Sequence, residues 1–150
     1  LYKTNGQIYY KLKDYDKAIK DLELYNKYNP KDFINLRNLA ASYKAKGDTS
    51  SELKYYGKMI NYNPEVVEGY FLRSQLNINL KKFENAIKDL NIAIKINKNN
   101  EALYYLRGLA YEKLKEYDKA KENYEKAIEI KPEYQHHIDG LARVKKIIGK

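Results

Sequence analysis

Cysteine is missing from this chain of 150 residues, which excludes a disulfide framework and a thiolate metal site. Tryptophan is also absent and phenylalanine occurs three times, whereas tyrosine occurs 17 times. Tyrosine must therefore supply most of the large side chains of the core. Its ring can be buried between two helices while its hydroxyl reaches their rim.

Long apolar runs are absent as well, since no segment approaches the roughly 20 apolar residues that a membrane-spanning helix needs. No signal peptide is visible. Hydrophobic residues make up 43% and charged residues 33%, which is typical of a chain that folds rather than one that stays disordered. The cytoplasm is the default expectation for its location, but the compartment stays open because a targeting signal could lie upstream of residue 1.

What the chain does contain is a repeat of 34 residues. Residues of one kind recur at this spacing with no insertion or deletion, and the clearest series is one of small residues: Gly6, Ala40, Ser74 and Gly108. The register divides the sequence into four units of about 1–32, 33–66, 67–100 and 101–134.

Each unit predicts two amphipathic helices. The small residue in the first helix allows the second helix to approach closely. In the second helix, apolar residues recur in steps of four and three, as in Ala18, Leu22 and Tyr25, which is the period of a buried helix face. A short break at Lys115–Glu116 separates the two helices of the last unit. Three units end close to a proline, which cannot continue a helix: Pro30, Pro64 and Pro132.

This pattern resembles the tetratricopeptide repeat, whose signature combines two aromatic residues, a Leu-Gly pair, a tyrosine, an alanine and a proline. The resemblance covers residues 1–134 and implies an all-α fold, a right-handed α-solenoid of four helix hairpins. Departures at Glu52, Met59 and Asn77 are expected to loosen the packing of the second and third units. The last unit matches best, with Arg107 inserted in the Leu-Gly pair: Tyr104, Leu106, Gly108, Tyr111, Ala120, Tyr124 and Pro132.

Residues 135–150 resemble the capping helix that closes such arrays. Residues 1–150 are thus predicted to form a single domain. Because residue 1 falls inside the first helix of the register, we expect this domain to be part of a longer chain. Four apolar residues of the capping helix are expected to face the last hairpin: Ile138, Leu141, Ala142 and Ile148.

The family resemblance implies a function in binding partner peptides, because the first helices of the family line a concave groove. We therefore expect a non-catalytic scaffold or adaptor, with no cofactor, that binds an extended or helical segment of another protein. Twelve residues are predicted to face the groove: Lys3, Gln7, Lys11, Arg37, Asn38, Lys44, Phe71, Leu72, Gln75, Tyr105, Leu106 and Leu109.

The predicted groove is basic in its first half and apolar in its second. Clustered apolar side chains on one exposed face usually mark a binding site. The alternative is that the capping helix or neighbouring repeats cover them, and then they only contribute to packing. We expect acidic residues of a partner to be steered by Lys3, Lys11, Arg37 and Lys44, and its apolar residues to be anchored by Phe71, Leu72, Tyr105 and Leu109.

Some members of the family clamp the C-terminal carboxylates of cytosolic heat-shock chaperones. Of the five clamp positions, Lys3 and Asn38 match, whereas Gln7 replaces an asparagine. Glu68 and Leu72 replace the second lysine and the arginine. A glutamate repels a dicarboxylate and a leucine offers it no donor, so the sequence argues against a working clamp.

Other functions find less support. The sequence has no Gly-rich phosphate loop, no H-E-x-x-H motif and no cysteine nucleophile, and we expect no enzyme. His136 and His137 are adjacent, so on a helix they point about 100° apart and do not share a metal. The net charge of +9 is spread over the chain, which favours weak attraction to acidic partners over nucleic-acid binding. Self-association through the first unit and the tail is the main alternative.

Overall fold

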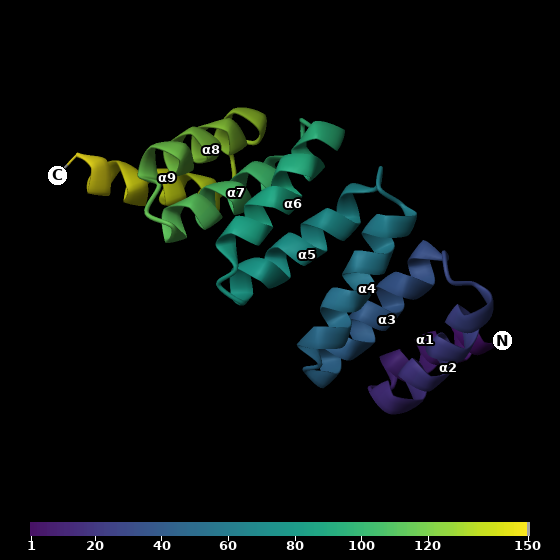
Figure 1. The fold of residues 1–150 in the computed structure, drawn as a ribbon. Coiled ribbons are helices and arrows are strands. Elements are labelled where there is room, and N and C mark those ends of the chain that lie inside the picture. The colour runs from purple at the N-terminus through teal and green to yellow at the C-terminus, as the bar shows by residue number, and fades with distance from the viewer. Residues whose placement is uncertain (150) are drawn as a thin grey trace. The chain divides into compact units, whose positions relative to one another are not determined.

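The structure is a computed structural model that describes residues 1–149. Within that range it contains α-helices and no strand, which confirms the predicted all-α fold (Figure 1). The helices are α1 (Tyr2–Lys11), α2 (Tyr15–Tyr28), α3 (Phe33–Lys46), α4 (Thr49–Tyr62), α5 (Val67–Asn79), α6 (Phe83–Ile96), α7 (Glu101–Lys113), α8 (Tyr117–Ile130) and α9 (Gln135–Ile148).

Neighbouring helices pack as hairpins within two compact units. The first unit is Leu1–Gly69, and the second holds the described residues from Tyr70 on, so α5 begins in one and continues into the other. In the first unit, α1 packs against α2, α3 against α4, and α3 also against α2. In the second unit, α7 packs against α6 and α8, while α9 lies on α8 and touches α7. The extent of one domain over the whole chain stays a prediction.

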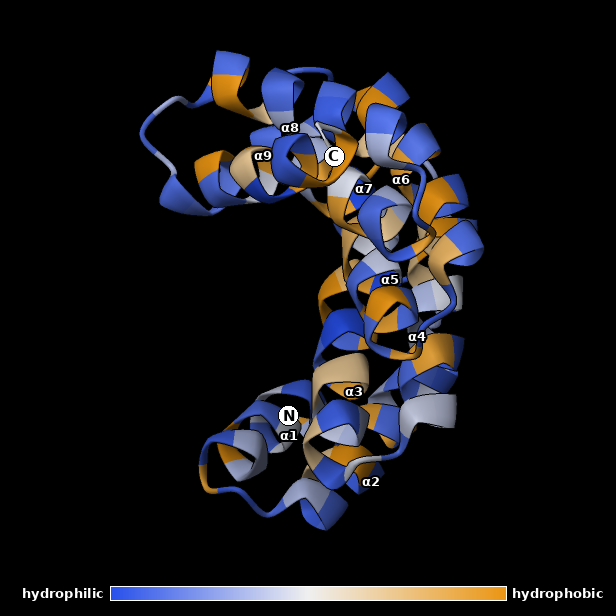
Figure 2. Cartoon of the chain, turned by 90° about the vertical axis from the view of Figure 1, so that its left-hand side faces the viewer, coloured by the Kyte–Doolittle hydropathy of each residue, from blue (hydrophilic) through white to orange (hydrophobic). Residues whose placement is uncertain are grey.

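The sequence specifies where several helices begin. Asp14, Asp32 and Asp48 precede α2, α3 and α4, and the carboxylate of each accepts a hydrogen bond from the backbone N–H three residues further on. This contact satisfies one of the N–H groups that have no partner in the first turn of a helix. Within each helix, hydrophobic and hydrophilic segments alternate along the ribbon, as an amphipathic helix requires (Figure 2).

The small residues of the first helices do lie where the second helices approach closely. A Cβ atom added to Gly6 would lie 2.5 Å from Cγ of Leu22, and one added to Gly108 would lie 3.0 Å from the ring of Tyr124. Ala40 and Ser74, at the same position of the register, are fully buried. The prediction that these positions must be small is therefore confirmed, because a larger side chain would separate the two helices.

Tyrosine supplies large core side chains, as its abundance predicts. Tyr55, Tyr56 and Tyr124 are at most 3% exposed, and the hydroxyl of each donates a hydrogen bond to a carboxylate: that of Glu23, Glu52 and Glu112, respectively. The rings thus fill the hairpins while carboxylates satisfy their hydroxyls.

The contact face of α9 differs from the predicted one. His137, Gly140 and Val144 are buried in place of the predicted residues, and only Leu141 of the four packs against the buried cluster around Tyr124. Ile148 is 44% exposed but lines a pocket with residues 115–119 of the last hairpin. The prediction was wrong for Ile138 and Ala142, which are exposed. The reason is Gly140, where an added Cβ would lie 2.8 Å from the ring of Tyr124. The helix rests on that ring through its glycine, and this contact sets its rotation.

The turn inside each hairpin contains one residue with a left-handed backbone. These residues are 34 positions apart, and three of the four are lysines: Lys13 (φ 62°), Gly47 (φ 76°), Lys81 (φ 58°) and Lys115 (φ 62°). At each turn, the N–H groups of this residue and of the next one bond back to carbonyls of the preceding helix. This pair of hydrogen bonds ends a helix. It favours glycine at the left-handed position, because glycine has no Cβ to clash there.

Replacing two of these lysines by glycine should stabilise the protein. Lys81→Gly and Lys115→Gly are each expected to raise the free energy of unfolding by about 0.5–1 kcal/mol, because the left-handed conformation penalises a residue with a Cβ. The matched control is Lys88→Gly, at an exposed position inside α6, where glycine should lower the free energy of unfolding by about 1 kcal/mol. Urea denaturation followed by circular dichroism measures both. Equal signs for the two kinds of variant would contradict this account of the turns.

Candidate functional site

A pocket of about 350 Å³ lies between the first helices of the first two hairpins. Both of these helices, α1 and α3, belong to the first unit, and α1 also contacts α3 directly. All the lining residues are on the face that the register assigns to the groove, and three of them are predicted groove residues: Gln7, Lys11 and Asn38. The full lining is Gln7, Tyr10, Lys11, Asn38 and Ala41.

The lining is mixed in chemistry. Gln7 and Asn38 carry amides, which both donate and accept hydrogen bonds. Tyr10 is 38% exposed, and its ring offers an apolar surface together with the methyl group of Ala41. Lys11 is exposed and adds one positive charge. The Nδ2 atom of Asn38 is buried and has no hydrogen-bond partner among residues 1–149.

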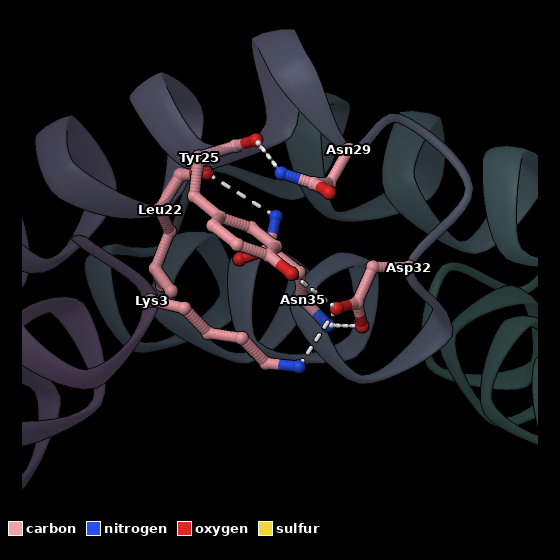
Figure 3. A network of polar contacts seen from close by, with 6 residues as sticks. All are labelled: Lys3, Leu22, Tyr25, Asn29, Asp32 and Asn35. Carbon is pink, nitrogen blue, oxygen red and sulfur yellow. Dashed lines mark hydrogen bonds and ion pairs between the residues drawn. The ribbon is translucent and has the colours of Figure 1, made fainter. Parts of the chain in front are cut away.

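Lys3, the first predicted groove cation, is held by the protein itself. Its ammonium lies 2.7 Å from a carboxylate oxygen of Asp32, and the hydroxyl of Tyr25 donates to the same oxygen at 2.9 Å (Figure 3). The other oxygen of Asp32 accepts from the backbone N–H of Asn35 and caps α3. Burial alone would raise the pKa of Asp32, but the hydrogen bonds from Lys3, Asn35 and Tyr25 outweigh it and keep that pKa below its usual value.

Arg37, a second predicted groove cation, is also paired. Its guanidinium lies 3.3 Å from a carboxylate oxygen of Glu68, in the first turn of α5. Lys11 and Lys44 are exposed, and neither has an ion-pair partner within the described residues. Of the four cations predicted to steer a partner, two are therefore neutralised inside the first unit and two remain open to solvent.

The predicted groove residues of the second unit are partly buried. They come from two first helices, α5 and α7: Phe71, Leu72, Gln75, Tyr105, Leu106 and Leu109. The ring of Tyr105 lies 5.9 Å from that of Tyr124 and 5.2 Å from that of His137, so α8 and α9 cover part of it. The other five keep part of their surface accessible, and their role in binding stays a prediction.

Asp32 and Glu68 are the site residues that sequence reasoning missed. In the sequence, Glu68 departs from the chaperone clamp and lies on the groove face of the third unit, whereas Asp32 belongs to no recognised motif. A signal was available, since Lys3 and Arg37 occupy the same position of the 34-residue register and each is followed about 30 residues later by an acid at the start of the next first helix.

Two other kinds of site find no counterpart in the described residues. Residues 1–149 contain no group of three or more side chains suited to hold a metal ion. In the same range, every helix is too short or too polar to cross a membrane.

Comparison with models of protein families identifies the family of the 34-residue repeat. A family model described as tetratricopeptide repeat matches residues 102–134 and another matches residues 6–32, while a model described as TPR repeat matches residues 78–115. Together the matches cover more than half of the chain. The chain belongs to the tetratricopeptide repeat family.

Relatives within the family match most of this chain in sequence. It is 27% identical over 140 residues to Hsp70-Hsp90 organizing protein 3 of Arabidopsis thaliana, which covers 93% of this chain and 25% of that protein. The chain spans about a quarter of the length of the curated relatives it matches.

Solved structures agree with the all-α repeat fold. A crystal structure of MamA aligns with a TM-score of 0.88 and 27% identity, over 96% of this chain and 84% of that one. The first TPR of Spaghetti (RPAP3), bound to HSP90 peptide SRMEEVD, aligns with a TM-score of 0.75 over 79% of this chain and 94% of that one. Its identity is 24%, so this second likeness concerns the fold alone.

Proposed function

We propose that this chain is a non-catalytic interaction module that binds a peptide segment of a partner protein on the first helices of its hairpins. The observation that carries this proposal is the pocket between α1 and α3, whose five lining residues all lie on the expected groove face. Membership of a family of interaction modules supports the same function.

The pocket suits a short segment of peptide. The amides of Gln7 and Asn38 can pair with the N–H and C=O groups of an extended backbone, which carries both donors and acceptors. An apolar side chain of the peptide can rest on Tyr10 and Ala41.

The second unit would supply apolar anchors. Phe71, Leu72 and Leu109 are partly accessible on first helices, and Tyr105 keeps part of its ring exposed. Apolar and aromatic anchors account for much of the affinity of most interfaces, whereas exposed charges chiefly increase the rate of association. Lys11 and Lys44 are the cations available for such steering of a partner's acidic residues.

Glutamate at either of two groove positions of the second unit should weaken peptide binding. A partner captured from lysate is mapped to one synthetic peptide, and its Kd is measured with Leu72→Glu and Leu109→Glu. Each is expected to weaken binding by about tenfold or more, because a charge replaces an apolar contact. The matched control is Ile92→Glu, which alters an equally apolar residue that is 42% exposed on α6, a second helix.

Thermal unfolding must accompany this measurement, because Leu72 and Leu109 are partly buried. Phe71→Ala serves as a milder variant that adds no charge. Unchanged affinity in folded Leu72→Glu and Leu109→Glu would show that the partner does not use these first helices.

A second candidate is self-association, favoured by exposed apolar side chains on α1, on the two residues that flank it, and on α9. Leu1, Ile8 and Leu12 are 90%, 49% and 69% exposed, and Ile147 and Ile148 are 40% and 44% exposed. Both helices are basic, so mutual repulsion would oppose their contact at low salt. Light scattering over a range of concentrations and salt decides this candidate, since a constant monomer mass would exclude it.

A further inference from the structure

Lys3 and Arg37 occupy equivalent positions of the repeat, and each is bound by a carboxylate from the start of the next first helix. Asp32 is the N-cap of α3, and Glu68 lies in the first turn of α5. The same arrangement thus occurs twice within the first unit. The later residues of this series are aromatic, Phe71 and Tyr105.

The pair of Lys3 and Asp32 is the stronger of the two. Their side chains are 28% and 21% exposed, and three donors converge on the carboxylate, from Lys3, Tyr25 and Asn35 (Figure 3). The pair of Arg37 and Glu68 is more open, at 43% and 38% exposed, with one bond of 3.3 Å. An incoming carboxylate would have to displace an internal one and then lie beside its negative charge.

We infer that Asp32 and Glu68 determine the specificity of the first unit by neutralising Lys3 and Arg37, so that this unit rejects peptides with adjacent carboxylates. The peptide that fits has an uncharged anchoring segment, with amide or backbone groups toward Gln7 and Asn38 and an apolar side chain on Tyr10. At most one carboxylate is accommodated, beside Lys11. This inference rests on the proposed function, because it concerns what the same groove binds.

The probe for this inference is the acidic peptide SRMEEVD, which is bound by the first TPR of Spaghetti (RPAP3). Its affinity is measured by calorimetry for the unaltered protein and for the double variant Asp32→Asn/Glu68→Gln. The asparagine keeps the oxygen that caps α3 and removes the charge that holds Lys3. We expect no saturable binding to the unaltered protein, and a gain of about tenfold or more in the double variant.

Two controls separate specificity from net charge and from misfolding. Asp16→Asn/Glu129→Gln changes the charge equally and releases Lys46, the last residue of α3, and Lys126 on α8 from ion pairs that do not involve Lys3 or Arg37; it should gain nothing. Glu68→Gln alone leaves the cap of α3 intact and should give part of the gain. Adding Lys3→Ala to the double variant should remove most of it.

The outcomes distinguish this inference from the proposed function. Equal binding of SRMEEVD to the unaltered protein and to Asp32→Asn/Glu68→Gln would overturn the inference, as would an equal gain in the Asp16→Asn/Glu129→Gln control. The proposed function fails separately, when the mapped partner peptide is insensitive to Leu72→Glu and Leu109→Glu. A gain of SRMEEVD binding that Lys3→Ala reverses supports the inference whatever the identity of the natural partner.

Discussion

Alkaline solution is expected to unfold this protein between about pH 10.5 and pH 12, because ionisation of its buried tyrosines opposes folding. Tyr55, Tyr56 and Tyr124 are buried. Burial is the main cause that raises the pKa of each above its ordinary value, and a hydrogen bond to a carboxylate is the second cause. At Tyr43, burial and, to a smaller extent, the negative charge of Glu23 raise the pKa to about 12. In the unfolded chain, tyrosine ionises near about pH 10.

The direction of the effect follows from these raised pKa values. Below about pH 10 the tyrosines are protonated in both states, and their stabilising hydrogen bonds are fully present. Above that pH the unfolded chain loses protons that the folded one keeps. Each buried tyrosine then lowers the free energy of unfolding by about 1.4 kcal/mol per pH unit. Three of them lower it by about 6 kcal/mol at about pH 11.5, which is comparable to the whole stability of an ordinary domain.

Tyr124→Phe tests this account within one hairpin. Removing the hydroxyl should cost about 1 kcal/mol at neutral pH, because Glu112 loses one donor but keeps Arg143. The variant also lacks one of the tyrosines whose ionisation in the unfolded chain lowers the free energy of unfolding. Above about pH 11 it should therefore be more stable than the unaltered protein. Tyr28→Phe is the control, since the ring of Tyr28 is 70% exposed. Circular dichroism reports unfolding and ultraviolet absorbance reports phenolate. Phenolate formation at Tyr124 in a fully helical protein would contradict the prediction.

The hairpin register was predictable because it depends on contacts that are short in sequence. Gly6 must be small because Leu22 lies against it, and both belong to one repeat. The pattern occurs four times at the same spacing, and each occurrence supports the register given by the others. The left-handed turn residues could not be predicted, because Gly47 alone has the residue type that this conformation favours. Lys81 and Lys115 adopt a conformation that their side chains disfavour, because the hydrogen bonds of the turn require it.

The rotation of α9 and the pairing of the groove cations depend on contacts that periodicity does not reveal. Gly140 looks like a weak point of an amphipathic helix, yet it is where that helix rests on Tyr124. Lys3 looks like a free cation on a polar face, yet Asp32, the N-cap of the next first helix, binds it. Such pairs depend on the rotamers of long side chains. The periodicity of a helix predicts on which face a residue lies, but it does not predict which side chain the residue contacts.

Loss of Arg73 is expected to cost about 3 kcal/mol of stability, because it would leave a buried carboxylate without a cation. The guanidinium of Arg73 on α5 donates two hydrogen bonds to Asp89 on α6, at 2.8 and 2.7 Å. The side chain of Asp89 is 6% exposed and that of Arg73 is 30% exposed. The hydrogen bonds to Asp89 also raise the pKa of Arg73, so the guanidinium stays charged. Arg73→Met keeps much of the side-chain volume and removes only the charge and its donors.

The next repeat provides the natural control for this prediction. There Arg107 takes the place of Arg73, and Asn123 takes the place of the aspartate and accepts from its guanidinium at 2.7 Å. Asp89→Asn copies that pair and should cost only about 1 kcal/mol, since a buried amide needs no counter-charge. The double variant Arg73→Met/Asp89→Asn should therefore be more stable than Arg73→Met alone. Denaturant unfolding of the unaltered protein and the three variants gives the four free energies of a double-mutant cycle, which measures the coupling. Additive effects would mean that the two side chains do not stabilise each other, and that α5 and α6 are held together by their apolar contacts.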